Sequence, residues 1–556
     1  MNGRSIAILG GGVAGLSAAH ELAERGFRVS IYERHAIVGG KSRSMAVPGT
    51  AVGGRRGLPG EHGFRYFPRF YSHVTDTMSR IPFGRNPRGV LDNLVDTTRT
   101  AALFSGRPGF VNSARFPRDV ADLKCVHQTL FRNGLALHGA DVSRLLRLLL
   151  RVSASCDERR GTEIDALTWS MLTDARQGSA GYQLLTGLTQ LFVALRAEEI
   201  SAKTTSLVLI RMIRDLGTPG GSADRVLNGP TSDVWLEPWR EHLTRLGVEI
   251  CCDAVVHSLH VEDGRIAGAV IQQGDHKKTI AADYFICALP VEVAAQLVTP
   301  ELARLDAGLA SLPMLRHHTR WMTGIQFFLR RPPDMVHGHS IHVDSPWALT
   351  SICSQQFWPA SRLATYGDGC IGAVLTVDIS DWDKPGVCGK TAKQCSAEEI
   401  RDEVWRQLED SCNVGGQHVL DVRERVAWYL DPALHPAQGE TPASNDEPVF
   451  VNGAGTWALR PTAATSLPNL LLAGDYVRTA TDLACMEGAN EAARRAVNEI
   501  LRRAGSSAAP CRLFPFPELP LSSPLRALDA LRYRAQRAFR AAVNPSSHHL
   551  AAQPAA

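Results

Sequence analysis

Three glycines near the start of the chain have the spacing of a phosphate-binding turn. Gly10, Gly12 and Gly15 form the pattern G-x-G-x-x-G, with Ala14 inside it. The first glycine permits a tight turn, the second lets a pyrophosphate approach the backbone, and the third lets a helix pack closely on the preceding strand. A diphosphate placed there would meet free backbone N–H groups and the positive end of a helix dipole. The chemistry that this spacing predicts is the binding of a dinucleotide.

An acidic residue follows this turn at the distance expected for a ribose contact. Glu33 lies 18 residues beyond Gly15. A carboxylate at this place accepts hydrogen bonds from ribose hydroxyls and repels a 2′-phosphate. NADP is therefore not expected, and these residues alone leave both NAD and FAD open.

The elements around the glycines are those that would hold them in place. Residues 6–9 are an apolar run typical of a buried strand, and the segment after Gly15 is rich in Ala and Leu, as expected for a helix. Residues 28–32 form a second strand-like run that ends at Glu33. The pattern of strand, glycine turn, helix, strand and acid predicts one unit of a Rossmann-like fold.

A further pattern follows Glu33 directly. Arg34 is followed by Gly39, Gly40 and Lys41. At this point the sequence resembles the flavin-dependent amine oxidase and phytoene desaturase superfamily, whose FAD-binding signature continues from the acidic residue into a GG-R/K element near the cofactor. NAD dehydrogenases have no such continuation. The resemblance implies that the cofactor is FAD and that these four residues lie beside it.

Residues 469–501 look like the C-terminal FAD motif of the same superfamily. A buried strand is followed by Gly474 and Asp475, a loop, and a helix that runs to about Arg503. Asp475 can bind ribitol hydroxyls, and the helix N-terminus would stabilise the negative charge that builds on a flavin during reduction. The resemblance adds to the cofactor site the residues that open this helix, Met486, Glu487 and Ala489.

The middle of the chain also resembles the superfamily, and this match sets the expected domains. Val255 and Val256 correspond to a region that contacts the adenine side of FAD, and residues 262–264 read as a hairpin turn. The expected fold class is α/β: a Rossmann-like FAD-binding domain interleaved with an α+β substrate domain. The first is assigned to 1–90, 225–300 and 450–504, and the second to 91–224 and 301–449. The second carries helical patterns at 142–152 and 183–196 and strand-like runs at 323–329 and 370–377.

Two positions bear on the substrate. Amine oxidases of this superfamily carry an aromatic residue just before the methionine of the second motif, whereas this chain has Cys485 there. They also carry a lysine near the flavin, but no lysine occurs between Lys278 and Lys384. The resemblance thus favours desaturation or dehydrogenation of an apolar, isoprenoid or carotenoid-like substrate. Amine or amino-acid oxidation stays an alternative, and so does a flavoprotein relative that binds lipidated or prenylated partners without chemistry.

Candidate catalytic residues follow the GG-K element. Residues 60–67 read GEHGFRYF, where related proteins carry an acidic-Gly-His loop beside the flavin. Glu61, His62, Arg65 and Tyr66 are the candidates, with caps of a loop as the alternative role. The pair at 317–318 could supply a histidine base, although a solvated or hydrogen-bonded pair is the simpler interpretation. Cys485 is interpreted as a packed residue rather than a nucleophile.

Composition narrows the function classes. The 556 residues carry a net charge of +4 and a globular share of hydrophobic residues, too little charge over such a length to indicate nucleic acid. The twelve cysteines form no C-x-x-C pair, so no metal site or disulfide framework is expected. No second nucleotide motif suggests NAD(P)H, and oxygen or a quinone is the expected electron acceptor. Without a leader-like segment or an apolar run of 18 residues, the expected location is cytoplasmic.

The charge is concentrated in the last segment, 505–556. Six arginines and two acidic residues lie after Ala504, so this segment carries the whole +4. A Pro-spaced stretch leads to a predicted amphipathic helix over 523–543, with Leu525, Leu528, Leu531 and Phe539 on one side and arginines opposite. Three roles remain open: docking on the protein itself with the arginine face in solvent, peripheral contact with an anionic membrane on its cytoplasmic side, and binding of a protein partner.

Overall fold

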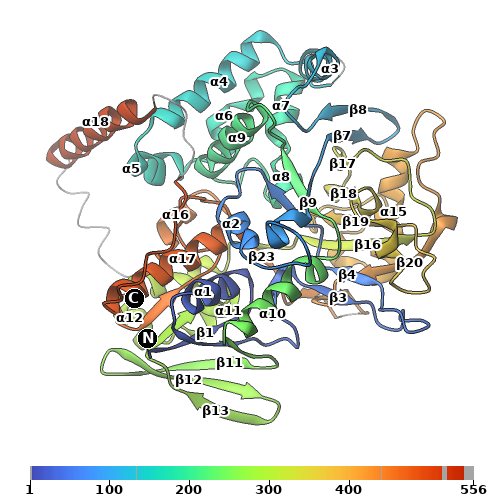
Figure 1. Cartoon of the computed structure of the whole chain (residues 1–556). Coiled ribbons are helices and arrows are strands. Elements are labelled where there is room, and N and C mark those ends of the chain that lie inside the picture. The colour runs from blue at the N-terminus through green and yellow to red at the C-terminus, as the bar shows by residue number, and fades with distance from the viewer. Residues whose placement is uncertain (1–2, 133, 440, 516–521, 544–556) are drawn as a thin grey trace.

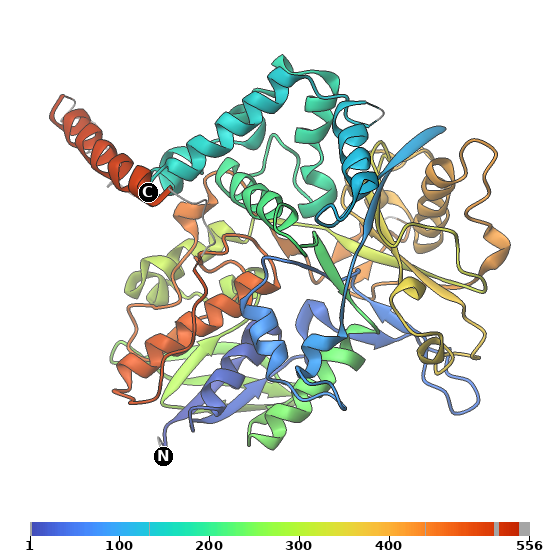
Figure 2. The ribbon, with the colours of Figure 1, turned by 45° about the horizontal axis from the view of Figure 1, so that its top comes forward.

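The computed structural model describes residues 3–132, 134–439, 441–515 and 522–543. Figure 1 shows three regions: a lower one around a parallel sheet, an upper one made of helices, and a lateral one around a second sheet. Figure 2, turned by 45°, shows that the helix α18 (Ser522–Val543) projects at the edge of the upper region. The sheet in the lower region carries the cofactor motifs.

Five parallel strands form the lower sheet in the order β10-β2-β1-β14-β24. The three strands β1, β14 and β24 are almost wholly buried because helices and loops cover both faces, which is why their sequences are continuous apolar runs. This is the Rossmann-like α/β arrangement predicted from the sequence. The strands have the bounds β1 (Ser5–Leu9), β2 (Arg28–Tyr32), β10 (Glu249–Cys251), β14 (Tyr284–Cys287) and β24 (Leu470–Leu472).

Helices from opposite ends of the chain cover this sheet. α1 (Val13–Ala23) packs against α17 (Met486–Arg503), and the Asn490 side chain donates to Ser17 Oγ at 2.8 Å. α10 (Glu237–Arg245) lies on the other flank of α1 (Figure 1). The predicted helix end at Arg503 is confirmed.

A three-stranded antiparallel sheet extends below, formed by β11 (Val255–Glu262), β12 (Arg265–Gln273) and β13 (His276–Ile280). Its first turn is the predicted one: Glu262 pairs with Arg265, and Asp263 and Gly264 both have positive φ, 48° and 70°. Two positive φ values are what a tight hairpin needs to match the twist of its strands.

The lateral region contains a seven-stranded sheet whose order is β20-β16-β19-β18-β17-β7-β8. All neighbours are antiparallel except β7 and β17, and α15 (Ala397–Cys412) packs on one face through Ile400, Val404 and Leu408. All seven strands fall within the ranges expected for the substrate domain. They are β7 (Arg99–Phe104), β8 (Arg107–Ser113), β16 (Thr323–Leu329), β17 (Gly338–His342), β18 (Leu349–Cys353), β19 (Ala373–Ile379) and β20 (Arg425–Leu430).

The upper region is helical. The pattern at 142–152 lies inside one long helix, but the predicted helix over 183–196 is wrong as a single element. It is divided into two short helices, and Ala194 has a φ of 53° that ends the second. The helices are α3 (Val120–Phe131), α4 (Gly139–Ala154), α5 (Asp157–Arg159), α6 (Trp169–Thr173), α7 (Ala180–Gly187), α8 (Thr189–Val193) and α9 (Ala202–Leu216).

The C-terminal helix α18 docks on the protein, but not with the expected face. Asp529 accepts hydrogen bonds from the Cys156 N–H at 2.8 Å and from Arg159 Nε, and the buried Tyr533 bonds Thr162 Oγ1 at 2.7 Å. These polar contacts turn the apolar side outward, so that Leu531 is 66% and Phe539 69% exposed. Searched over the described residues, no helix has both the length and the apolar character needed to cross a bilayer.

Candidate active site

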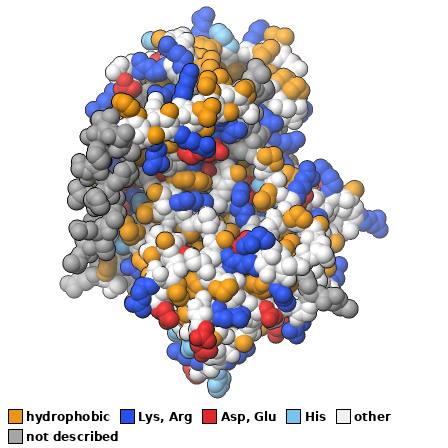
Figure 3. Space-filling model, turned by 90° about the vertical axis from the view of Figure 1, so that its left-hand side faces the viewer, with side chains coloured by type: hydrophobic (Ala, Val, Ile, Leu, Met, Phe, Trp, Pro, Cys, Tyr) orange, Lys and Arg blue, Asp and Glu red, His pale blue; other side chains and the backbone are white. Residues whose placement is uncertain are grey.

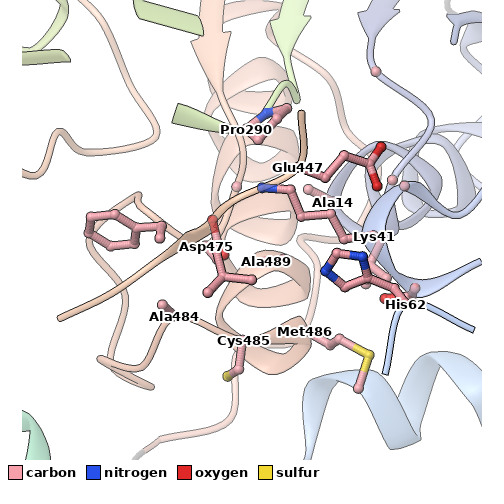
Figure 4. A pocket seen from close by; sticks show the side chains of 18 of the residues that line it. Ala14, Lys41, His62, Pro290, Glu447, Asp475, Ala484, Cys485, Met486 and Ala489 are labelled. Carbon is pink, nitrogen blue, oxygen red and sulfur yellow. The ribbon is translucent and has the colours of Figure 1, made fainter. Parts of the chain in front are cut away.

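One long cavity runs along the carboxyl ends of the parallel strands, where ligands of open α/β sheets bind. Gly10, Glu33 and Asp475, which follow three different strands, all line it. Figure 4 shows how the two ends of the chain meet there: Ala14, Lys41 and His62 come from the N-terminal part and Asp475, Cys485 and Met486 from the C-terminal part.

The glycine turn has the geometry that a dinucleotide needs. Gly10 has a φ of +105°, and a Cβ there would lie 2.8 Å from the Ala288 carbonyl oxygen. Gly12 begins α1, and among the described residues no side chain caps this helix end, while Val13 and Ala14 line the cavity. The first-turn N–H groups are therefore left for an anion such as a diphosphate. Gly15 does not line the described cavity; its missing Cβ, which would lie 2.0 Å from Gly10 O, lets helix and strand pack.

Glu33 lines the cavity, and two backbone N–H groups orient its carboxylate. Its buried carboxylate accepts the Gly11 N–H at 2.7 Å on one oxygen and the His35 N–H at 2.9 Å on the other. Each oxygen has a second lone pair, which can accept a hydroxyl from the cavity side. The motif thus orients the carboxylate before any ligand arrives.

Sequence reasoning missed Glu447, which lies beside this end of the cavity. Burial would raise the pKa of Glu447, but the hydrogen bond from His35 and the charges of Arg43 and Arg34 hold it well below its usual range. Glu447 therefore anchors the loop that carries Arg34. No local pattern signals Glu447, because its partners Arg34, His35 and Arg43 come from the other end of the chain.

The GG-K element lies against the glycine turn. The Gly39 N–H donates to Gly11 O at 2.9 Å, and a Cβ on Gly40 would lie 3.1 Å from Gly12 Cα. Lys41 lines the cavity and forms an ion pair with Glu292 at 2.7 Å. Close backbone contact between two glycine loops explains why the signature needs glycines at both places. Val255 and Val256 also line the cavity.

The C-terminal motif supplies the opposite wall. Gly474, Asp475, Met486 and Ala489 line the cavity, and burial raises the pKa of Asp475. Glu487 is different: it is absent from the described lining, and its carboxylate points to the start of α2 (His73–Ser79). Its expected cofactor contact is not what this geometry supports.

Cys485 lies just before α17, at the cavity wall. Burial raises the pKa of its thiol to about 11, so the thiol stays protonated near neutral pH. A thiolate is the reactive form of cysteine. The interpretation as a packed residue is therefore the one that the environment favours.

The four catalytic candidates separate into two groups. His62, Arg65 and Tyr66 line the cavity. Glu61 is not part of the lining as far as it is described; its buried carboxylate accepts hydrogen bonds from Ser44 Oγ, Thr231 N–H and Thr231 Oγ1. These contacts support the alternative that Glu61 stabilises the loop. The described lining likewise does not include the histidines at 317–318.

The two ring nitrogens of His62 differ in their hydrogen bonding. Nδ1 contacts the buried Asp431 carboxylate, whose pKa burial would raise but the hydrogen bond and charge of His62 lower. Nε2 is buried and has no hydrogen-bond partner among the described residues. Because Asp431 is ionised, Nδ1 donates its proton to that carboxylate. The neutral tautomer that this contact favours would carry its lone pair on Nε2.

A second unpredicted group is Asp378, the last residue but one of β19. Burial raises its pKa to about 7, against the lowering effect of Arg65. It lines the cavity close to Gly63, whose missing Cβ would lie 2.5 Å from its carboxylate. The strand-like run at 370–377 did not reveal it, because this mainly apolar run ends one residue before Asp378.

The residues present therefore fit FAD: an uncapped helix end for the diphosphate, the carboxylates of Glu33 and Asp475 at the cavity, and a second helix start at the far wall. Comparison with known proteins agrees. The profile of the flavin containing amine oxidoreductase family matches residues 13–501. The chain belongs to this family. It is an FAD-dependent oxidoreductase.

Individual relatives and solved structures are similar to the chain over most of its length. The chain is 25% identical over 95% of its length to the carotenoid phi-ring synthase of Streptomyces griseus, covering 93% of that protein. It is 22% identical over 90% to the 15-cis-phytoene desaturase of Synechococcus elongatus, covering 96% of it. Among solved structures, the cyclohexylamine oxidase of Brevibacterium oxydans shares the fold with a TM-score of 0.57 at 13% identity, over 90% of this chain and 99% of that one.

Proposed function

We propose that this flavoenzyme dehydrogenates an apolar, carotenoid-like substrate. The observation that carries the proposal is the wall beside the second motif, where the cavity is lined mainly by aliphatic and aromatic side chains. Such a wall favours a hydrocarbon and offers little to an ammonium group. The two relatives named above, a carotenoid phi-ring synthase and a 15-cis-phytoene desaturase, support the same substrate class. The wall residues are Val193, Ile200, Met322, Phe450, Val451 and Leu483.

The residues of the chain divide the remaining work. Bound FAD supplies the acceptor for a hydride from a substrate C–H bond. The apolar wall excludes water and holds the hydrocarbon, and the start of α17 places positive dipole at the far wall of the cavity. His62 accepts the proton lost from the adjacent carbon at Nε2, while Asp431 holds the ring through Nδ1. Arg65 and Tyr66 shape the same end of the cavity.

Anaerobic stopped-flow spectroscopy tests the substrate class. Candidate polyenes and a set of primary amines are mixed separately with the purified holoenzyme, and flavin bleaching is followed. We expect bleaching by a polyene and none by the amines. Bleaching by an amine alone would establish the alternative, an amine oxidase, and would overturn the proposal.

The role of His62 is tested with His62→Gln. We expect a fall in the rate of flavin reduction of about 10²-fold or more, with the pH dependence of the wild-type rate lost in the variant. Flavin content serves as the control for folding. A variant that keeps both the rate and the pH profile would remove His62 from the mechanism.

We also infer that oxygen or a quinone reoxidises the reduced enzyme. Double-mixing experiments that add oxygen, a soluble quinone or NADP⁺ to the reduced enzyme decide this point. Fast reoxidation by one of the first two is expected, and reoxidation by NADP⁺ alone would refute it.

We infer finally that the chain meets a membrane peripherally, on its cytoplasmic face, through residues 523–543. Leu525, Leu528, Leu531 and Phe539 are all exposed on α18, so this apolar side is the one that would enter the bilayer boundary. Three arginines on the helix form ion pairs with the protein itself. Co-sedimentation with vesicles tests this with Leu531→Glu/Phe539→Glu, and Arg28→Gln, far from α18, is the control. Wild type and control should sediment and the double variant should not; equal sedimentation of all three would refute the contact.

A further inference from the structure

A second cavity, of about 700 Å³, lies below the first turns of α18. It is bounded by the start of α9, by α16 (Thr456–Leu459) and by the second half of α17. Its size is in the range of about 300–1,000 Å³ that is usual for ligand pockets. The loop 479–485 separates it from the flavin cavity: Thr479, Ala480 and Asp482 line the second cavity, and Leu483 and Cys485 line the first.

Positive charge dominates the lining of this second cavity. Six cationic side chains and three carboxylates belong to it. Figure 3 shows the face of the molecule that bears α18, with Lys and Arg side chains prominent on it and hydrophobic ones gathered towards the top. The cations are Arg160, Lys203, Arg478, Arg495, Arg502 and Arg526, and the carboxylates are Asp157, Asp482 and Glu499.

Lys203 is buried and Arg478 is half-buried, and the charges of both have little compensation. The side chain of Lys203 is 6% exposed, and its Nζ lies over the Trp457 ring, 3.2 Å from Asp482. Asp482 is shared, because Arg460 also pairs with it at 2.8 Å. Arg478 donates to the backbone carbonyl oxygens of Trp457 and Ala458, at 2.9 Å each, and no salt bridge of the described residues includes it. Burial lowers the pKa of both Lys203 and Arg478.

A hydroxyl group in the cavity wall also indicates an anionic ligand that accepts hydrogen bonds. Thr479 Oγ1 is buried at the wall and has no hydrogen-bond partner among the described residues. A hydroxyl beside guanidinium and ammonium groups is the donor set that binds the oxygens of a phosphate. An oxyanion here would satisfy the hydroxyl and compensate the charges of Lys203 and Arg478 together.

The edge of the cavity borders the apolar surface of α18. Arg526 lines the cavity, while its neighbours Leu525 and Leu528 are exposed. Leu513, also exposed, lines the cavity from the segment before α18. A ligand with a phosphate in the cavity could therefore lay a hydrocarbon chain along α18.

We propose that this second cavity binds a phosphate group, and that its ligand is the headgroup of an anionic phospholipid. The preference for a lipid rests on the membrane contact proposed above; the phosphate site itself does not. Because loop 479–485 forms a wall of both cavities, lipid binding would also fix the position of Cys485 beside the flavin.

Calorimetry with soluble ligands tests the site without a membrane. The holoenzyme is titrated in phosphate-free buffer with dihexanoyl phosphatidylglycerol below its micelle concentration, with the phosphatidylcholine analogue, and with inorganic phosphate. We expect the phosphatidylglycerol to bind most tightly. The double variant Arg478→Gln/Arg495→Gln should bind it at least about 100-fold more weakly, because two charge-assisted hydrogen bonds are lost.

Matched variants keep the test decisive. Arg532→Gln/Arg537→Gln removes the same charge from exposed positions of α18 that do not line the cavity, and its affinity should equal that of the wild type. Unchanged flavin absorbance would show that both double variants are folded. Equal affinity for inorganic phosphate would refute the lipid preference and keep the phosphate site. No binding by the wild type, or equal weakening in both double variants, would overturn the site, whereas failure of substrate oxidation alone would leave it standing.

Discussion

The position of Glu487 makes a prediction that separates a structural role from a role at the flavin. Its carboxylate accepts the N–H groups of Ser72 and His73 at 2.7 Å each and of Val74 at 2.9 Å, and His73 Nδ1 lies 2.8 Å away. Among the described residues, no side chain of its own caps α2. A carboxylate from another helix thus supplies the cap of α2 and binds α2 to α17.

Glu487→Gln removes the charge and turns one acceptor oxygen into an NH₂ group. A hydrogen bond to a buried charged acceptor contributes about 1.5–3 kcal/mol, and the new NH₂ group would face the Val74 N–H. We expect the free energy of unfolding to fall by about 2–4 kcal/mol. The midpoint potential of the flavin should not change, because the carboxylate points away from the cavity.

Urea unfolding and a redox titration of the same preparation measure the two quantities. Glu499→Gln is the matched control on the same helix: its partner Arg502 is exposed, and Arg503 keeps its hydrogen bonds to two backbone carbonyl oxygens. Its effect should therefore be smaller, about 1 kcal/mol. A shifted flavin potential with unchanged stability in Glu487→Gln would refute the reasoning and restore the flavin contact expected from the sequence.

Three further predictions follow from the same geometry. Gly15→Ala should yield protein with little flavin, measured by the absorbance ratio, because the new Cβ would lie 2.0 Å from a backbone oxygen; Gly187→Ala, with nothing within 4 Å, should keep its flavin. Between about pH 4 and its native-state pKa of about 7, Asp378 is protonated in the folded protein and ionised in the unfolded chain. The free energy of unfolding should therefore fall by up to about 4 kcal/mol as the pH rises through this window. Asp378→Asn should lose this dependence in unfolding measured at several pH values. Tyr533→Ala should speed hydrogen–deuterium exchange in α18, since it removes the one core side chain among those described on that helix; unchanged exchange would contradict this.

Much of the fold was predictable because its signals are local. The glycine turn, the buried strands and the hairpin turn at Asp263 and Gly264 each depend on residues a few positions apart. The resemblance then joined distant segments into one cofactor site, and all but Gly15 and Glu487 of the expected cofactor residues line the cavity.

What could not be predicted depends on contacts between distant segments. Glu487 and Glu61 stand in signature motifs, but their carboxylates are satisfied by backbone N–H groups from elsewhere in the chain. Asp378 and Glu447 have no local pattern at all. For α18, periodicity located both faces, but Asp529 and its distant partners decided which one meets the protein.

The order of the strands has a consequence for biosynthesis. The parallel sheet begins with β1 and β2, yet its last strand is β24, and α1 packs on α17 from the far end of the chain. A ribosome must therefore synthesise about 500 residues before the Rossmann-like unit can close. Nascent chains that are released early should be unable to retain FAD, and no N-terminal fragment can serve as a minimal flavoprotein.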